Sequence, residues 1–183
     1  MVGIWVHNKH GHTDRIRVTV RRADGSIKSD HYLNDSLIHR IFVKLHLSHN
    51  TMTKYGFAAA AGLLANIGSY TAFGSIGIGT GTNPSSVNDQ YMQTPLKIKS
   101  VTPTQVTTSY SNDTVQWQAT FSNALDGLTG TDSITEIAIL NGNTNTTPTI
   151  MLLHQVYSPA DSVNFSQGDT ITVTVTDKME QGS

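Results

Sequence analysis

The sequence contains no cysteine among its 183 residues. This absence excludes disulfide bonds, thiolate nucleophiles and zinc sites built on thiolates. Long apolar runs are also missing, because the longest, from Phe57 to Ile67, is far short of the roughly 20 residues that a membrane-spanning helix needs. The N-terminal residues have no apolar stretch of the kind found in a secretory signal. We therefore expect neither a membrane span nor a membrane partner.

Charged residues are scarce, at 14% of the chain, where about a quarter is usual. Thr, Ser, Asn and Gly are abundant instead, which favours strands and turns exposed on a large assembly over a helical enzyme. The charges are also uneven: residues 1–54 carry nine Lys or Arg and four Asp, a net +5, and residues 55–183 carry three Lys and nine Asp or Glu, a net −6. This asymmetry can steer copies into head-to-tail association or bring the basic half to an acidic partner. The simpler interpretation is that the strands within 14–33 carry a solvated basic face.

Residues 15–22 alternate polar and apolar side chains, as a half-buried strand does. Residues 23–26 then form a turn in which Gly25 can adopt positive φ, and residues 27–33 return as a second strand. We expect this basic β-hairpin to be an N-terminal extension, residues 1–50, of a body formed by the rest of the chain. An isolated hairpin is not stable in water, so it either folds back on its own body or pairs with a neighbour's sheet edge. We favour donation to a neighbour, as an attachment to a larger assembly.

The body, residues 51–183, is predicted to begin with a helix. Thr53 is typical of an N-cap ahead of a helix over 54–67, and Gly68 is typical of the residue that ends one. An apolar stripe is expected to pack on the sheet or on a neighbouring subunit; it consists of Leu63, Leu64 and Ile67. The preceding segment, 37–47, fits either a strand or a helix.

The rest of the body reads as short strands separated by turns. Strands are predicted at 72–78, 96–101, 105–110, 115–121, 134–140, 150–156 and 171–175. Their lengths and turn signals predict a mainly β fold, an antiparallel β-sandwich or partly closed barrel over residues 70–177. Period-two spacing predicts eight buried positions: Trp117, Phe121, Ile137, Ile139, Leu152, Val156, Ile171 and Val173. The low-complexity segment 141–148 is expected to be an exposed hairpin tip.

Histidines are the first residues to consider for chemistry. Two clusters have spacings that can hold a transition metal, and their members are His7, His10, His12, His46 and His49. A catalytic site would add a carboxylate ligand, for which Asp14 is the candidate near the first cluster. The alternative that we favour is a polar N-terminal loop.

Other chemical patterns are weaker. Gly77, Gly79 and Gly81 superficially resemble a phosphate-binding loop, but no P-loop lysine follows, so tight turning after a strand explains them better. No Ser or Thr lies in a nucleophile elbow. Glu136 is interpreted as a structural hydrogen-bond acceptor at a strand start. We therefore assign no catalytic, cofactor-binding or metal-binding residue and expect the protein not to be an enzyme.

One resemblance emerges from the order of several motifs. Residues 75–89, a Gly-x-Gly-Thr segment followed by Pro and Asp, resemble a segment of many small structural proteins of tailed bacteriophages and related archaeal viruses. Residues 115–121 resemble the central strand of that group, and residues 134–141 resemble its Ile-x-Glu-Ile-Gly-Leu-Phe-Asn strand. Residues 152–159 and 168–176 resemble its two closing strands.

The resemblance covers about residues 55–177 and departs from the group in two places. Ala138 stands where the group prefers Gly, and residues 1–50 have no counterpart. The resemblance implies a virion protein, such as a tail, neck, spike or capsid-decorating component. Its partners would be other virion proteins and copies of itself, without a specific nucleic acid or a small-molecule substrate.

Two other classes remain as alternatives. One is a carbohydrate-binding or host-surface-binding module, in which Tyr110, Trp117 or Tyr157 would be exposed beside polar loops. An inward Trp117 would disfavour it. The other is a metal-dependent enzyme that uses the N-terminal histidines.

Overall fold

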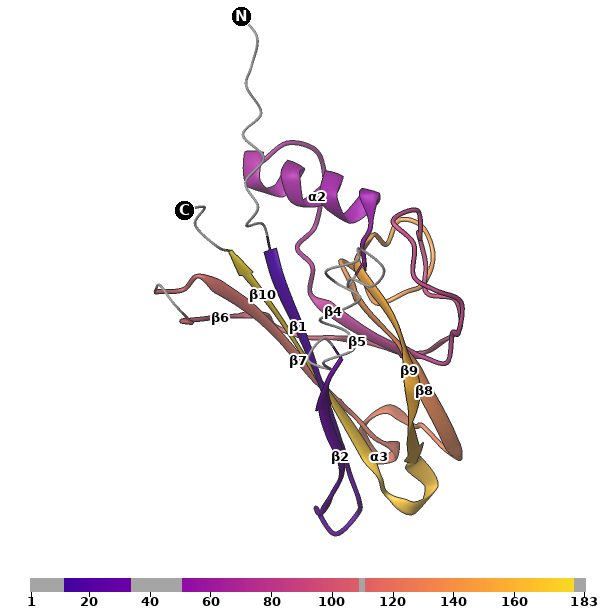
Figure 1. Ribbon diagram of the computed structural model, residues 1–183. Helices are drawn as coiled ribbons and strands as arrows, with labels where there is room; N and C mark the ends of the chain where they lie inside the picture. The colour runs from indigo at the N-terminus through magenta and orange to yellow at the C-terminus, as the bar shows by residue number, and fades with distance from the viewer. Residues whose placement is uncertain (1–11, 34–50, 109–110, 180–183) are drawn as a thin grey trace, which may run out of the picture.

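The computed structural model describes residues 12–33, 51–108 and 111–179 (Figure 1). Within these ranges the chain forms two antiparallel sheets of five strands each, packed face to face as a β-sandwich, with no closed barrel. The predicted fold class is therefore confirmed in its sandwich form.

The first sheet contains strands from both ends of the described chain. In spatial order they are β2 (Ile27–Tyr32), β1 (His12–Arg21), β10 (Thr170–Met179), β7 (Thr114–Phe121) and β6 (Thr104–Val106). The second sheet contains β3 (Thr51–Met52), β9 (Met151–Asn164), β8 (Thr131–Leu140), β4 (Ser75–Gly79) and β5 (Pro95–Ser100). The helical elements are α2 (Lys54–Ala65), α3 (Asn123–Asp126) and the 3-10 turn η1 (Phe165–Gln167).

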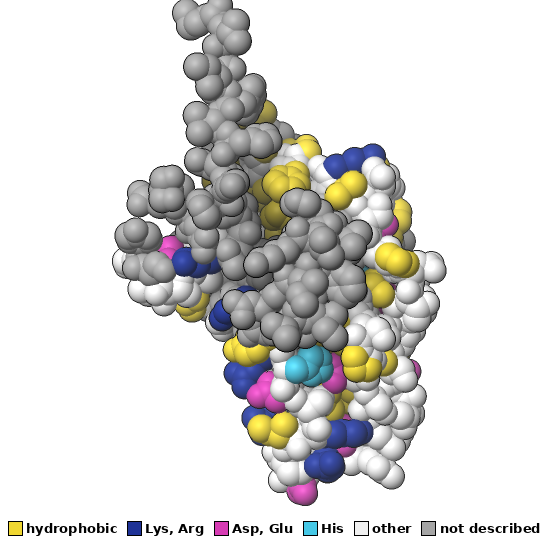
Figure 2. Space-filling model, in the orientation of Figure 1, with side chains coloured by type: hydrophobic (Ala, Val, Ile, Leu, Met, Phe, Trp, Pro, Cys, Tyr) yellow, Lys and Arg dark blue, Asp and Glu magenta, His cyan; other side chains and the backbone are white. Residues whose placement is uncertain are grey.

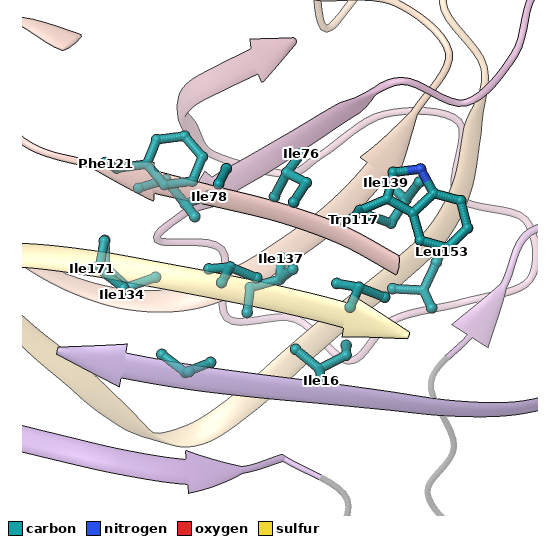
Figure 3. Close-up of a cluster of buried hydrophobic side chains, with 14 of the residues drawn as sticks. Ile16, Ile76, Ile78, Trp117, Phe121, Ile134, Ile137, Ile139, Leu153 and Ile171 are labelled. Carbon is teal, nitrogen blue, oxygen red and sulfur yellow. The ribbon is translucent and has the colours of Figure 1, made fainter. Parts of the chain in front are cut away.

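The core lies between the two sheets, where branched apolar side chains from both inner faces meet (Figure 3). Of the eight predicted core positions, all but the half-buried Val156 are buried. Each fully buried side chain of this size contributes about 1.5–3 kcal/mol. Trp117 is only 5% exposed, and its indole N–H donates to the carbonyl of Phe73 at 2.7 Å. The exposed platform that a sugar-binding Trp117 would need is therefore not present.

The N-terminal hairpin is confirmed, but it belongs to the sandwich of its own chain. Strand β1 pairs with β10 in register from His12↔Met179 to Arg21↔Thr170, and with β2 on its other side. Its inward side chains, Ile16, Val18 and Val20, are fully buried. The predicted donation to a neighbour is thus wrong for these strands, because the edge of β10 within the same chain satisfies the hydrogen bonds of β1.

Polar contacts also fasten the hairpin to the turn before β10 and to β9 of the second sheet. Lys28 of β2 donates to Asp169 at 3.0 Å, and Ser29 donates to Asp161 of β9 at 2.8 Å. The imidazole of His31 lies 3.4 Å from the carboxylate of the same Asp161. The basic half of the sequence therefore meets the acidic half within one molecule. Figure 2 shows side chains of both charges interspersed at the hairpin end.

Lysines close the opposite side of the sandwich. Lys97 of β5 donates to the carbonyl of Asp126 at 3.0 Å, and Lys99 donates to the carbonyl of Thr120 at 2.8 Å. Lys99 also forms an ion pair with the carboxylate of Asp126 at 3.2 Å. Edge lysines of this kind hinder pairing with a foreign strand, so β5 is a poor candidate for strand addition.

Helix α2 begins where the sequence predicts and ends slightly earlier. The side chain of Thr53 accepts from the N–H of Gly56 at 2.9 Å, as an N-cap does. At the other end Asn66 adopts the left-handed conformation that ends the helix, with φ of 53°, two residues before Gly68, which also has positive φ. Asn is, after Gly, a residue that tolerates this conformation.

The helix packs on the sheet through its small residues. Gly56 and Ala59 are buried, and a Cβ on Gly56 would lie 2.5 Å from the Cα of Leu152. The predicted packing stripe faces solvent instead, since Leu63, Leu64 and Ile67 are 38%, 81% and 68% exposed. Packing of this stripe on its own sheet is therefore a wrong prediction, because only small residues allow so close an approach. Packing on a neighbouring subunit stays a prediction.

The remaining differences concern element limits. Strand β4 begins at Ser75 instead of residue 72, and β9 continues to Asn164, well beyond the predicted end. The short helix α3 lies in the connection between β7 and β8, where no helix was predicted. The ambiguous segment 37–47 lies outside the described residues.

Candidate functional site

A buried carboxylate on the outer face of the second sheet organises the loop of residues 80–94. Glu136 lies in the middle of β8 and is fully buried. Its two oxygens accept from the backbone N–H groups of Gly81 at 3.3 Å, Gln93 at 2.5 Å and Thr94 at 3.1 Å. Because these donors come from both ends of the loop, one side chain holds both ends on the sheet. The interpretation of Glu136 as a structural acceptor is confirmed, although it lies mid-strand and not at a strand start.

His154 of β9 joins this carboxylate to a second one. The imidazole is fully buried, with Nε2 at 2.8 Å from Glu136 and Nδ1 at 2.6 Å from Asp89. Asp89 lies in the same loop and also accepts from the N–H of Ser86 at 2.7 Å. Each ring nitrogen faces a carboxylate oxygen, so both nitrogens donate when both acids are ionised and the ring is an imidazolium. We call Asp89, Glu136 and His154 the carboxylate–histidine clasp.

Electrostatics favour the charged form of the clasp. Burial alone would raise the pKa of Glu136, but the hydrogen bond from His154 and those from the N–H groups of Gln93 and Thr94 outweigh it and hold the pKa below its ordinary value. Burial alone would lower the pKa of His154, but its hydrogen bonds to Glu136 and Asp89 outweigh burial and raise the pKa. The two shifts have the signs expected of a buried ion pair.

The glycines of β4 and the following residues fit this arrangement. A Cβ on Gly79 would lie 2.4 Å from the carbonyl oxygen of Thr94 and 2.5 Å from Glu136. A Cβ on Gly81 would lie 2.7 Å from the same carboxylate. Neither glycine has positive φ. These positions therefore need glycine because the clasp and the loop approach them closely, and the predicted reason, tight turning, is wrong.

The same loop is tied to two other parts of the outer layer. The side chain of Asn145 accepts from the N–H of Met92 at 2.8 Å and donates to its carbonyl at 2.9 Å. The N–H of Lys54, at the start of α2, donates to the carbonyl of Val87 at 2.9 Å. The predicted hairpin tip 141–148 is thus mostly exposed but contributes Asn145 as a latch.

The geometry of the clasp is structural in character. A general base needs a nitrogen within reach of a substrate proton, whereas both nitrogens of His154 are engaged and the ring has no exposed surface. Among the described residues there is no group of three or more acidic or histidine side chains that could hold a metal ion. What the clasp does is fix a loop of fifteen residues onto a sheet.

Two surface depressions lie near the clasp. The smaller, of about 180 Å³, is lined by Tyr55 and Tyr91 among others, and is below the roughly 300–1,000 Å³ of typical small-molecule sites. The larger, of about 440 Å³, is lined by Thr135 and Tyr157 among others. Their hydroxyls are already used within the chain, because Thr135 donates to Gly81 at 2.7 Å and Tyr157 donates to Asp161 at 3.1 Å. Neither depression displays the converging polar groups of a specific ligand site.

Several candidate residues from the sequence lie outside the described structure. These are His7, His10, His46, His49 and Tyr110, together with the side chains of His12 and Asp14. The clasp itself was not predicted as a unit. The signal that could have found it was an ionisable residue inside an otherwise apolar strand, Glu136 beside Ile137 and His154 between Leu153 and Gln155.

Comparison with known protein families, with curated proteins and with solved structures finds no match to this chain. Across the described ranges, no helix has the length and apolar character needed to cross a membrane.

Proposed function

We propose that this chain is a non-enzymatic structural component of a virus particle, working through assembly contacts with other virion proteins and with copies of itself. The observation that supports the proposal most is the meeting of three motif segments at one place. Segment 75–89 contributes Asp89 and the close glycines, segment 134–141 contributes Glu136, and segment 152–159 contributes His154. These segments are the ones that resemble small structural proteins of tailed bacteriophages and related archaeal viruses.

The convergence gives the resemblance a physical basis. Residues separated by 65 and 18 positions in the sequence are hydrogen-bonded to one histidine. A buried polar network is stable only when every member has its hydrogen-bond partner. Proteins with the same fold and the same clasp would therefore need all three motifs together. The assembly contacts would then be made by the surface of the sandwich, where the loops and helix α2 lie.

The carbohydrate-binding alternative is weakened by particular side chains. It needs exposed aromatic rings, whereas Trp117 is buried. Tyr157 is half-buried, and burial, with the nearby charge of Asp161, raises the pKa of its hydroxyl. The metal-dependent enzyme remains an alternative that a metal titration of the purified protein tests directly.

The experiment that tests the proposal is to look for the chain in particles. Particles purified from the source culture on a density gradient should contain the chain in a constant ratio to the other particle proteins, and a gold-labelled antibody should decorate them. As a control for adsorption, purified chain is mixed with particles that are then purified again, and this added chain should be washed away. A chain found only in the cell lysate would contradict the proposal.

Truncation is not a suitable way to map the contacts. Removing residues 1–50 would take away β1 and β2 and uncover the edge of β10, with three fully buried apolar side chains lost. We expect such a protein not to melt cooperatively, so a failure to assemble would report unfolding. Point variants at exposed residues are needed instead.

A further inference from the structure

The outer face of helix α2 carries apolar side chains in an unbroken ridge. Phe57 is 53% exposed and Leu64 is 81% exposed, and the exposed Ala61 lies between them. These positions are related as i, i+4 and i+7, which places them along one line on a helix. Ile67 and Tyr70, 68% and 39% exposed, extend the apolar surface beyond the helix end. We call Phe57, Ala61 and Leu64 the α2 ridge.

The segment that forms this surface carries no charged side chain after Lys54. Residues 55–88 contain no Asp, Glu, Lys, Arg or His, so nothing on the helix after Lys54 offsets the apolar ridge. A helix on the surface of a protein normally turns a charged face to water, and one that is apolar all round is normally covered. Depletion of charge is also what distinguishes the core of a protein interface from the rest of a surface. Figure 2 shows hydrophobic side chains at the surface of the α2 end.

We infer that the α2 ridge is a self-association surface that binds the same ridge of a second copy of this chain. A two-fold interface requires a surface that is complementary to itself, and an uncharged apolar ridge meets this condition because no like charges are brought together. An amphipathic membrane-binding helix would instead have Lys or Arg along a polar face, and α2 has none after its first residue.

The exposed area is sufficient for such a contact. Phe57, Leu64, Ile67 and Tyr70 are 39–81% exposed, and with roughly 200 Å² for each large apolar side chain this amounts to on the order of 500 Å² per copy. Two copies would bury on the order of 1,000 Å², the lower limit for a specific interface. The contact would therefore be a modest one, dependent on concentration.

The side-chain sizes along the ridge suggest how two helices meet. Ala61 lies midway between Phe57 and Leu64, so an antiparallel crossing at Ala61 places Phe57 of each copy beside Leu64 of the other. A small residue at the crossing point allows the helix axes to approach to about 8 Å. The small residues Gly56 and Ala59 hold the opposite side of the helix on its own sheet, so the ridge points away from that sheet.

The first test is the oligomeric state of the purified full chain, measured by sedimentation velocity over a range of concentrations. The wild type should dimerise at micromolar concentration, and Leu64→Glu should weaken dimerisation at least tenfold. Leu125→Glu is the matched control, because Leu125 is 71% exposed on α3, at the other end of the molecule (Figure 1). It should dimerise like the wild type.

The second test uses the absence of cysteine, which makes single-cysteine variants clean probes. Ala61→Cys should form a disulfide-linked dimer on mild oxidation, since a crossing at this residue brings the two Cα atoms within about 7 Å. Leu125→Cys should stay monomeric under the same conditions. This readout is independent of any effect of Leu64→Glu on folding.

A wild-type chain that stays monomeric at about 100 µM, or a Leu64→Glu variant that dimerises as well as Leu125→Glu, overturns the inference. Binding of a monomeric chain to phosphatidylcholine vesicles would also overturn it and identify the ridge as a membrane contact. The α2 ridge would be one of the contact surfaces of the proposed assembly role. Self-association through the ridge does not depend on that role, but its biological purpose does. Both tests use purified protein without particles, so their failure is distinguishable from absence of the chain in particles.

Discussion

Replacing Glu136 by Gln tests the clasp with almost no change in side-chain volume. The carboxylate accepts from four donors, the imidazole of His154 and the N–H groups of Gly81, Gln93 and Thr94. In a glutamine, one of the two oxygens becomes an NH₂ group, which can only donate at that position. At least one backbone N–H or the imidazole would therefore face another donor, and the charge opposite His154 would be lost.

The size of the effect follows from burial. Both Glu136 and His154 have fully buried side chains, and removing one partner of a buried ion pair costs about 3–5 kcal/mol because the other charge is left uncompensated. For a domain of this length, 1 kcal/mol corresponds to about 2–4 °C in Tm. We therefore expect Glu136→Gln to lower the Tm by about 10 °C. The lost free energy of about 3–5 kcal/mol would be a large part of a typical unfolding free energy of about 5–15 kcal/mol.

Thermal unfolding followed by circular dichroism measures this change, with urea unfolding as a check on its magnitude. The control is Asp30→Asn, which neutralises an acid in an exposed ion pair, where Asp30 contacts Arg17 at 2.6 Å. The guanidinium of Arg17 holds the pKa of Asp30 at about 2, but the pair is on the surface and its loss should change the Tm far less. A Glu136→Gln protein that melts within about 2 °C of the parent would refute the reasoning that the clasp holds the loop.

Three further outcomes follow from the same structure. Because the pKa of His154 is raised in the folded state, its contribution to stability should be complete below its ordinary value of 6.5 and be lost as the pH rises through the raised value. The contribution of Glu136, whose pKa is lowered, should be complete above its ordinary value of 4.5 and be lost as the pH falls. Urea unfolding across this pH range should show both losses, and a His154→Gln protein that keeps the loss at high pH would contradict the first. Gly79→Ala should cost about 1–3 kcal/mol of stability by overpacking. Gly74→Ala is the control and should melt like the parent, because its Cβ would have its nearest neighbour at 3.4 Å. Equal melting temperatures of the two variants would contradict the close approach of the clasp to Gly79. Gly62→Pro should break the hydrogen-bond ladder of α2 and cost about 3 kcal/mol or more, and a variant that melts and assembles like the parent would show that the helix is not structurally important.

Part of the candidate site was visible in the sequence and part was not. The segments that supply Asp89, Glu136 and His154 were each recognised as motifs, and Glu136 was identified as a structural acceptor. That the three residues meet was not predictable, because β8 and β9 are neighbours only after the sheet forms and the loop folds over them. The role of Gly79 was misjudged for the same reason: the group that it makes room for comes from a distant strand.

What the sequence alone determined about this protein is local. The alternation of Ile16, Val18 and Val20 defines a half-buried strand, and the Thr53 hydroxyl defines the helix start, because each depends on neighbouring residues and on backbone geometry. The tertiary structure alone decided which edge β1 pairs with and which face of α2 is turned to solvent. Any unpaired strand edge offers the same hydrogen bonds, so the choice of β10 depends on the three-dimensional position of that edge. In α2, Leu64 is exposed because the helix approaches β9 closely through its side that carries Gly56 and Ala59, and Leu64 lies on another side of the helix.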